Sequence, residues 1–232
     1  MQGDYGIAGW LKNSFIDFPG TVSTVLFFSG CNLRCPYCQN PRIVRGEDTI
    51  IPWQTIKEHL KKRAGITEGV VISGGEPTIH ACLPEFIEEV RSLGLKVKLD
   101  TNGLFPEAVE RCSLDYLAMD LKTVPSRYVK LGSPFDDTED RLRRSLSIVK
   151  KLGERAEVRI TVAPGLVDKE VIASLGEMCD GVSRIYLQQF QNETELMDLA
   201  YMNLDPVPIE TIRAYRDSIA QHAEQCVIRG YD

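Results

Sequence analysis

The sequence lacks any apolar run long enough for a membrane-spanning helix, so we expect no membrane partner. It also lacks an excess of positive charge, because 27 Lys and Arg residues stand against 33 Asp and Glu residues. The resulting formal charge of −6 has the wrong sign for a surface that coats nucleic acid. We therefore expect a protein or small-molecule substrate and no nucleic-acid partner.

The sequence also lacks a paired-histidine motif for a simple metal site and the pattern of a secretory signal peptide. The chain has three histidines, and neither His59 nor His80 belongs to a paired ligand motif. Residues 1–20 carry charged side chains and several glycines, so they do not resemble a signal peptide. We expect a cytoplasmic, reduced location, in which an odd total of seven cysteines argues against a disulfide framework. Four cysteines lack metal-like spacing and are expected to be core or spectator thiols: Cys82, Cys112, Cys179 and Cys226.

The composition that remains is typical of a soluble globular domain. Hydrophobic residues make up 43% of the chain and charged residues 26%, with no internal repeat or low-complexity segment. A chain of 232 residues can bury one good core, so we predict a single domain over residues 1–232.

Apolar runs alternate with amphipathic stretches along the whole sequence. The strand-like runs are 21–28, 69–73, 96–100, 116–121, 157–162 and 184–189. The helix-like stretches are 52–63, 83–93, 106–112, 138–152, 169–178 and 209–225. Six strand–helix units predict an α/β fold with a parallel sheet, here an open (β/α)6 partial TIM-type barrel rather than a closed eight-stranded one. Residues 226–230 are expected to add an edge strand, and the irregular stretch 123–137 is either a docking loop or a plain surface excursion.

The strongest chemical motif is a set of three cysteines, Cys31, Cys35 and Cys38, spaced CxxxCxxC in the loop 30–41. Three thiolates hold three corners of a [4Fe–4S] cube and leave one iron without a protein ligand, whereas ferredoxin-type sites use four cysteines. The alternative is a zinc site, which requires a fourth Cys or His that does not lie nearby.

Polar signatures follow the other predicted strands, and in parallel barrels the chemistry collects at these carboxyl ends. Each has a structural alternative: a tight turn for the first two sets, an internal salt bridge for the third, and a satisfied core polar group for the last. The candidates are Gly74, Gly75 and Glu76; Asp100 and Asn102; Asp120 and Lys122; and Arg159 and Gln189.

The cysteine spacing, with Tyr37 before the third cysteine, resembles the radical S-adenosylmethionine (AdoMet) superfamily. The resemblance implies that the open iron chelates AdoMet, whose reductive cleavage yields a 5′-deoxyadenosyl radical. It also implies that Tyr37 packs on the adenine and that the Gly74–Gly75–Glu76 motif binds the AdoMet ammonium. Asp120 and Lys122 would meet the charged groups of the cofactor, with Asp100, Asn102, Arg159 and Gln189 as further cofactor contacts.

The segment 14–20 and the cysteine loop together resemble activating enzymes of anaerobic ribonucleotide reductase and of pyruvate formate-lyase. The resemblance implies hydrogen abstraction from a glycine Cα of a glycyl-radical protein, most closely anaerobic ribonucleotide reductase. It implies a reductant such as flavodoxin or ferredoxin, and a monovalent cation near Asp100 and Thr101. Two alternatives stay open: a radical AdoMet enzyme acting on a small molecule, such as a deazapurine synthase, and a non-catalytic metal-binding or electron-transfer module.

Overall fold

The computed structural model describes residues 5–230, and within them the chain forms two compact units that alternate along the sequence. The first unit contains residues 5–31, 42–101 and 107–117, and the second contains residues 32–41, 102–106 and 118–230. The prediction of a single domain therefore stays a prediction. No helix within residues 5–230 has the length and apolar character needed to cross a membrane.

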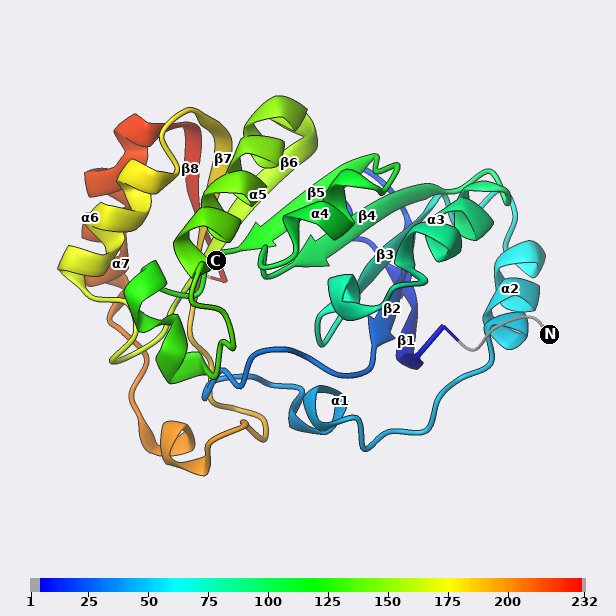
Figure 1. Cartoon of the computed structure of the whole chain (residues 1–232), viewed down its shortest axis with the longest axis horizontal. Helices are drawn as coiled ribbons and strands as arrows, with labels where there is room; N and C mark the ends of the chain where they lie inside the picture. Colours follow the sequence, from blue (N-terminus) through cyan, green and yellow to red (C-terminus); the bar gives the residue numbers. More distant parts are fainter. Residues whose placement is uncertain (1–4, 231–232) are drawn as a thin grey trace. The chain divides into compact units, whose positions relative to one another are not determined.

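Eight strands form one sheet in the order of the sequence, from β1 to β8 (Figure 1). Among the strand pairs whose register is described, only β1 with β2 is antiparallel. The sheet is open, with β1 and β8 as its two edge strands. The strands are β1 (Ile7–Ser14), β2 (Ser23–Phe28), β3 (Gly69–Gly74), β4 (Lys96–Thr101), β5 (Tyr116–Asp120), β6 (Ala156–Val162), β7 (Val182–Gln189) and β8 (Ala223–Arg229).

Helices follow the strands, as expected for a largely parallel sheet. The α-helices are α1 (Pro41–Arg45), α2 (Trp53–Lys62), α3 (Leu83–Arg91), α4 (Pro106–Glu110), α5 (Thr138–Leu152), α6 (Lys169–Met178) and α7 (Ile209–Ile219). Five short 3₁₀ helices complete the described structure: η1 (Pro77–Ile79), η2 (Pro125–Leu131), η3 (Gly153–Arg155), η4 (Leu199–Asn203) and η5 (Ala220–His222).

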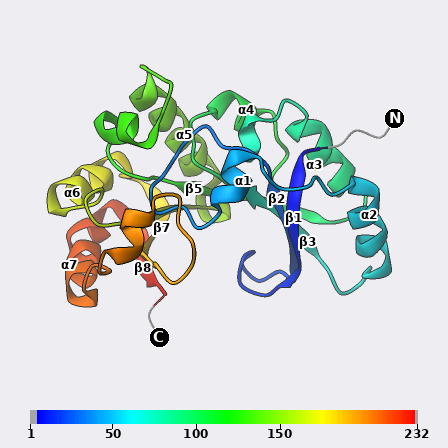
Figure 2. The same cartoon turned by 90° about the horizontal axis from the view of Figure 1, so that it is seen from below.

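In the first unit, β1 lies alongside β2, and β3 pairs with β2 on its other side (Figure 2). Helix α2 buries Trp53, Ile56 and Leu60, because positions three and four apart lie on one face of a helix. The Trp53 ring packs edge-on against Phe86 of α3, with their centroids 4.9 Å apart. Burial of these large side chains is what holds α2 and α3 to the sheet.

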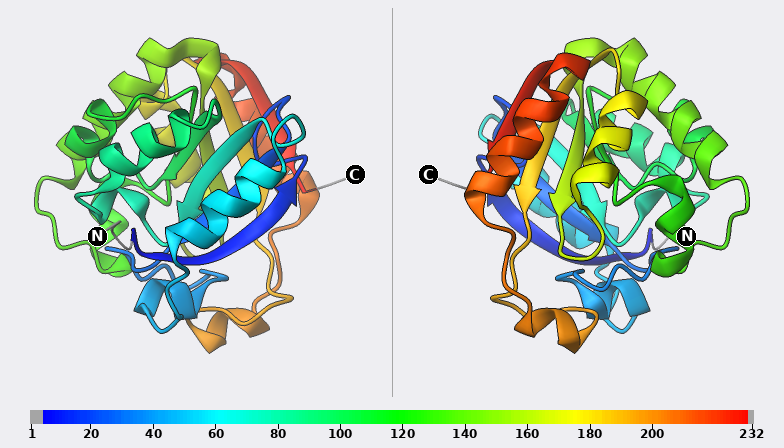
Figure 3. Two further views of the ribbon diagram at one scale, coloured as in Figure 1. Left: turned by 90° about the vertical axis from the view of Figure 1, so that its right-hand side faces the viewer. Right: turned by 90° about the vertical axis from the view of Figure 1, so that its left-hand side faces the viewer.

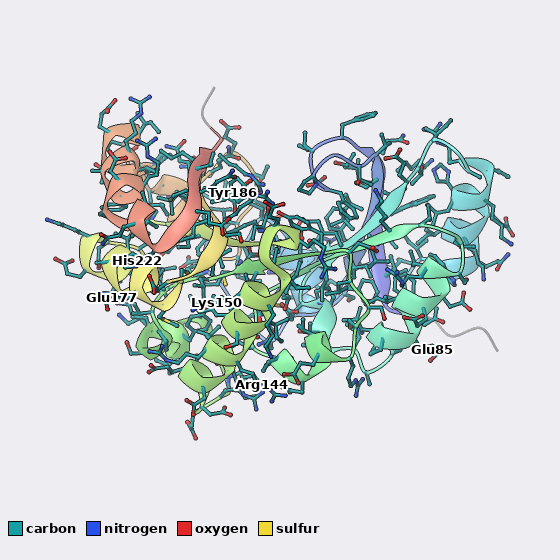
Figure 4. All side chains as sticks on the ribbon, turned by 90° about the horizontal axis from the view of Figure 1, so that it is seen from above. Glu85, Arg144, Lys150, Glu177, Tyr186 and His222 are labelled. Atoms are coloured by element: carbon teal, nitrogen blue, oxygen red, sulfur yellow. The ribbon has the colours of Figure 1, made fainter. Side chains whose placement is uncertain are left out.

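In the second unit, α6 contacts α7, and α7 also packs along β8 (Figure 3). The outermost strand β8 is held by a side chain that reaches across β7. Arg229 donates to both carboxylate oxygens of the buried Glu157 on β6, at 3.0 and 3.1 Å. Its guanidinium also lies 3.4 Å from the ring centroid of Tyr186, which is labelled on β7 in Figure 4.

The structure confirms the predicted α/β class, the mostly parallel open sheet and all six predicted strands. The predicted helix 209–225 was too long: α7 ends at Ile219, and the chain turns through η5 into β8, which begins at Ala223. Residues 123–137 are not irregular throughout, because η2 occupies their first half. A second long irregular stretch, 190–208, was missed and contains only η4.

Candidate active site

The cysteine loop follows β2 and is braced in the second unit by two segments that are distant in sequence. The Arg34 amide donates to the Leu131 carbonyl at the end of η2, at 2.7 Å. On the other side, the amides of Met197 and Asp198 donate to the carbonyls of Cys38 and Pro36, at 2.9 and 3.0 Å. The backbone around Cys35 and Cys38 is therefore positioned by tertiary contacts as well as by its own turn.

All three cysteines of the motif are reduced thiols. Burial raises the pKa of Cys35 to about 11, although the nearby Lys122 ammonium opposes this shift. Cys35 consequently keeps its proton at neutral pH until a metal displaces it, and metal loading should release protons.

The donor set is suited to an iron–sulfur cube. Within residues 5–230, no three His, Cys, Asp or Glu side chains are placed to hold a single metal ion. A [4Fe–4S] cube does not need such convergence on one point, because each thiolate binds a different iron. The soft thiol ligands of Cys31, Cys35 and Cys38 thus fit the predicted cluster by their chemistry.

The glycine pair after β3 packs against the chain that leaves β2. The amides of Gly75 and Glu76 donate to the carbonyls of Phe28 and Gly30, at 2.8 and 2.9 Å. Gly74 has a φ of 114°, and a Cβ on Gly75 would overlap the Gly30 carbonyl oxygen. Both glycines are therefore needed for close backbone contact within the protein, a reason that the sequence alone did not reveal.

Glu76 is buried, and its carboxylate organises the turn that follows β3. Its Oε1 accepts from the amide and hydroxyl of Thr78 and so caps η1 at its N-terminus. The same oxygen accepts from the Thr101 hydroxyl at 2.8 Å, which ties the ends of β3 and β4 together. A role for Glu76 toward the AdoMet ammonium stays a prediction.

Asp100, at the end of β4, is already engaged by a cationic side chain. The Nζ of Lys98 lies 2.6 Å from Asp100 Oδ1, and the Ser73 hydroxyl donates to Oδ2 at 3.2 Å. The implied monovalent cation does not fit beside this carboxylate as it stands, because an ammonium group is bound there. Lys98 was not among the predicted site residues, although its spacing of two from Asp100 along a strand indicates a shared face.

The second unit contains a partly buried ionic group formed by Asp120, Lys122 and Arg159. Arg159 Nε lies 2.6 Å from Asp120 Oδ1, and Lys122 Nζ lies 3.0 Å from Oδ2. Burial by itself would raise the pKa of Asp120, but the two cations outweigh it and hold this pKa well below its usual range. In the same way, burial would lower the pKa of Lys122, but Asp120 raises it well above its ordinary value.

These contacts bear on the alternatives drawn from the sequence. Asp120 and Lys122 do point to the same side, although β5 ends at Asp120 and Lys122 lies beyond it. The ion pair considered as the structural alternative is present, and Arg159 joins it. Binding of AdoMet charges by this group stays a prediction.

Tyr37 is distinguished by its buried hydroxyl, which has no hydrogen-bond partner among residues 5–230. Burial raises the pKa of Tyr37 well above its ordinary value. Tyr128, which is also buried, differs, because its hydroxyl accepts from the Lys122 amide at 3.1 Å. Orphaned buried polar groups are rare in proteins, and an orphan inside the cysteine motif fits a site that takes a ligand.

The two remaining candidates form hydrogen bonds inside the second unit. Asn102 Nδ2 donates to Asn32 Oδ1 at 2.8 Å, and Asn102 Oδ1 accepts from the Leu104 amide at 3.1 Å. Gln189 Nε2 donates to the Val207 carbonyl at 3.2 Å. Asn102 thus fixes the cysteine loop to the turn after β4, while Gln189 supports the stretch 190–208.

A thiol-bearing loop directly after a strand of a largely parallel sheet is typical of α/β enzymes that hold a metal cluster. Comparison with known families agrees with this class. A profile of the Radical SAM superfamily matches residues 25–178, and the chain belongs to this superfamily. It is therefore a radical AdoMet enzyme, as the cysteine motif predicted.

Three known proteins show how far the likeness extends. A provisionally named glycyl-radical enzyme activating enzyme of Methanocaldococcus jannaschii is 28% identical over 96% of this chain and 95% of its own length. The 7-carboxy-7-deazaguanine synthase of Methanopyrus kandleri is 31% identical over 78% of this chain and 79% of its length. The solved structure of QueE from Escherichia coli superposes with a TM-score of 0.60 at 13% identity, covering 97% of this chain and 93% of that one, which shows a shared fold.

Proposed function

We propose that this protein activates a glycyl-radical enzyme by removing a hydrogen atom from a glycine Cα of its partner. The observation that carries the proposal is the similarity to the Methanocaldococcus jannaschii protein, which spans 96% of this chain and 95% of that one. The motif residues Cys31, Cys35 and Cys38 lie inside the matched region and supply the cluster ligands that this chemistry requires.

Each group of site residues has a distinct task in this proposal. When bound at the three thiolates, the [4Fe–4S] cluster and AdoMet supply a 5′-deoxyadenosyl radical. Glu76 shapes the turn that receives the AdoMet ammonium, and Asp120 with Lys122 and Arg159 presents opposite charges to the methionine end of AdoMet. Tyr37, directly before the third cysteine, packs its ring against the adenine.

The partner that we propose is anaerobic ribonucleotide reductase, with flavodoxin or ferredoxin as the electron donor. The segment 123–137 is the proposed docking loop. Its anchors are the buried Tyr128 and Leu131, while Val129 between them is 73% exposed. An apolar side chain held outward by two buried neighbours is suited to contact a protein surface.

The test is electron-spin-resonance spectroscopy of the partner. The protein, reconstituted without oxygen, reduced with dithionite and supplied with AdoMet, is mixed with the anaerobic reductase. The expected result is a glycyl doublet together with 5′-deoxyadenosine, and the matched control is a reductase whose radical glycine is replaced by Ala. Formation of 5′-deoxyadenosine with no doublet, under conditions where a known activase produces one, contradicts the proposal.

A second candidate function is turnover of a small molecule, as in a deazapurine synthase. The observation behind this candidate is the identity of 31% to the Methanopyrus kandleri synthase over 78% of this chain. Cleavage of AdoMet that depends on the small-molecule substrate of those synthases, in the absence of any protein partner, would support it over the first.

A further inference from the structure

Lys98 is a lysine in an unusual setting within the first unit. Its side chain is 2% exposed, although lysine is among the residue types that are almost never fully buried without a partner. The partner here is Asp100, two residues along β4, whose Oδ1 lies 2.6 Å from the ammonium nitrogen. The Tyr116 ring centroid lies 6.0 Å from the same nitrogen, which adds a further favourable contact with the cation.

The ammonium and the carboxylate depend on each other. A buried cation is stable only beside an anion, so Lys98 cannot leave Asp100 without a large desolvation cost. Ser73 from β3 donates to the second carboxylate oxygen, which fixes the rotation of the Asp100 side chain. The two strands and the ammonium therefore hold Asp100 in one orientation at the carboxyl end of β4.

The same pair excludes a second cation from this position. A sodium or potassium ion bound by Asp100 Oδ1 would lie within a few ångströms of the Lys98 nitrogen, where two positive charges repel in a poorly solvated site. Displacing Lys98 from Asp100 would leave a buried ammonium without its counter-ion. The chain thus carries its own positive charge where the family resemblance implied a bound ion.

We propose that the Lys98 ammonium is the permanent cation of the Asp100 site, and that AdoMet binding by this protein needs no sodium or potassium ion. Lys98 is a positioning residue in this account: it acts on the cofactor through Asp100. The predicted effect on AdoMet affinity rests on the proposed function. The ion pair between Lys98 and Asp100 does not depend on a partner protein.

The first measurement uses the unaltered protein and no AdoMet. Its melting temperature is compared in sodium, potassium and tetramethylammonium chloride at equal ionic strength. We expect the same value in the three salts, because the cation position is already filled. A melting temperature raised by sodium or potassium alone would overturn the proposal. This result does not depend on whether a glycyl radical is ever formed.

The second measurement compares Lys98→Ala with Lys96→Ala, a matched control on the same strand whose side chain is exposed. Removing Lys98 empties the cation position, so sodium or potassium should now raise the melting temperature of the variant. AdoMet affinity of the cluster-loaded variant should fall about tenfold in tetramethylammonium and recover when potassium is added. The Lys96→Ala protein should behave like the unaltered one in every salt.

Several results would count against the proposal. One is a Lys98→Ala protein whose melting temperature and AdoMet affinity do not change when sodium or potassium is added. If Lys98→Ala does not fold, AdoMet affinity of the unaltered protein in the three salts decides the matter: equal affinities support the proposal, and a tenfold dependence on sodium or potassium overturns it. An unaltered protein that activates no partner, yet binds AdoMet equally in all salts, contradicts only the proposed function.

Discussion

The backbones of Gly75, which follows β3, and Gly30, which follows β2, lie in direct contact within the first unit. The Glu76 amide, next to Gly75, donates to the Gly30 carbonyl at 2.9 Å. The position of a Gly75 Cβ would coincide with that carbonyl group. This contact joins the first family motif to the second, because Gly30 precedes the cysteine motif directly.

Replacing Gly75 by Ala should therefore destabilise the protein severely. The added methyl group meets backbone that cannot rotate away, and we expect a loss of about 3 kcal/mol or more in the free energy of unfolding. Urea unfolding measures the change. Gly9→Ala is the matched control, because its Cβ would meet the Phe27 ring at an ordinary 3.5 Å and should change stability by less than about 1 kcal/mol. Equal effects of the two substitutions would show that the Gly75 contact is wrong.

The two buried tyrosines of the second unit allow a paired comparison. Tyr37→Phe removes a hydroxyl without a partner in the described chain and should raise the free energy of unfolding by about 1 kcal/mol. Tyr128→Phe leaves the Lys122 amide without its acceptor and should lower it by about 1–3 kcal/mol. Chemical denaturation of the metal-free variants separates the two. A greater loss for Tyr37→Phe than for Tyr128→Phe would mean that its hydroxyl does have a partner.

The cluster assignment predicts a sharp difference between cysteines. Cys35→Ala should abolish both the iron–sulfur absorbance and 5′-deoxyadenosine formation, because two thiolates cannot hold the cube. Cys226→Ala on β8 is the control, and it should keep iron content and turnover close to those of the unaltered protein. Iron analysis, visible absorbance and chromatography of the nucleoside make the comparison. Retained turnover by Cys35→Ala would refute the ligand set.

The ion pairs of Asp120 with Lys122 and Arg159 predict that the folded protein loses stability in acid. The folded-state pKa of Asp120 lies well below its ordinary value of about 4, so this group contributes stability above that value. The contribution is lost as the pH falls below about 4 toward the folded-state pKa. Urea unfolding between neutral pH and acid should consequently show that the free energy of unfolding falls more steeply for the unaltered protein than for Asp120→Asn.

The control for this pH profile is Glu210→Gln, which breaks an exposed pair with Arg213 on α7. Exposed pairs contribute little, so this variant should follow the unaltered protein at every pH. The assignment fails if Asp120→Asn and the unaltered protein lose stability in parallel. In that case the two cations beside Asp120 would not control its protonation.

Local patterns were sufficient for much of this fold. The run Val70–Ile72 is continuously apolar because β3 is buried on both faces, and such runs identified six of the eight strands. The edge strand expected over residues 226–230 is also present, as β8. The missed strand β1 is a half-exposed, antiparallel edge strand, and its apolar run Ile7–Leu11 is interrupted by Gly9. The helix predicted over 209–225 was too long, because the amphipathic pattern gives no sign of the turn that leads into β8 at Ala223.

The cysteine motif, the glycine pair and the polar strand ends were determined by the sequence itself, since spacing along the chain sets which side chains share a loop or a face. The tertiary structure decided which hydrogen-bond and ion-pair partners those residues have. It placed the ammonium of Lys98 on Asp100, added Arg159 to Asp120, and left the Tyr37 hydroxyl without a partner in the described chain. Arg229 and Glu157, 72 positions apart, show the reason: burial and charge pairing depend on which strands become neighbours, and that information is not local.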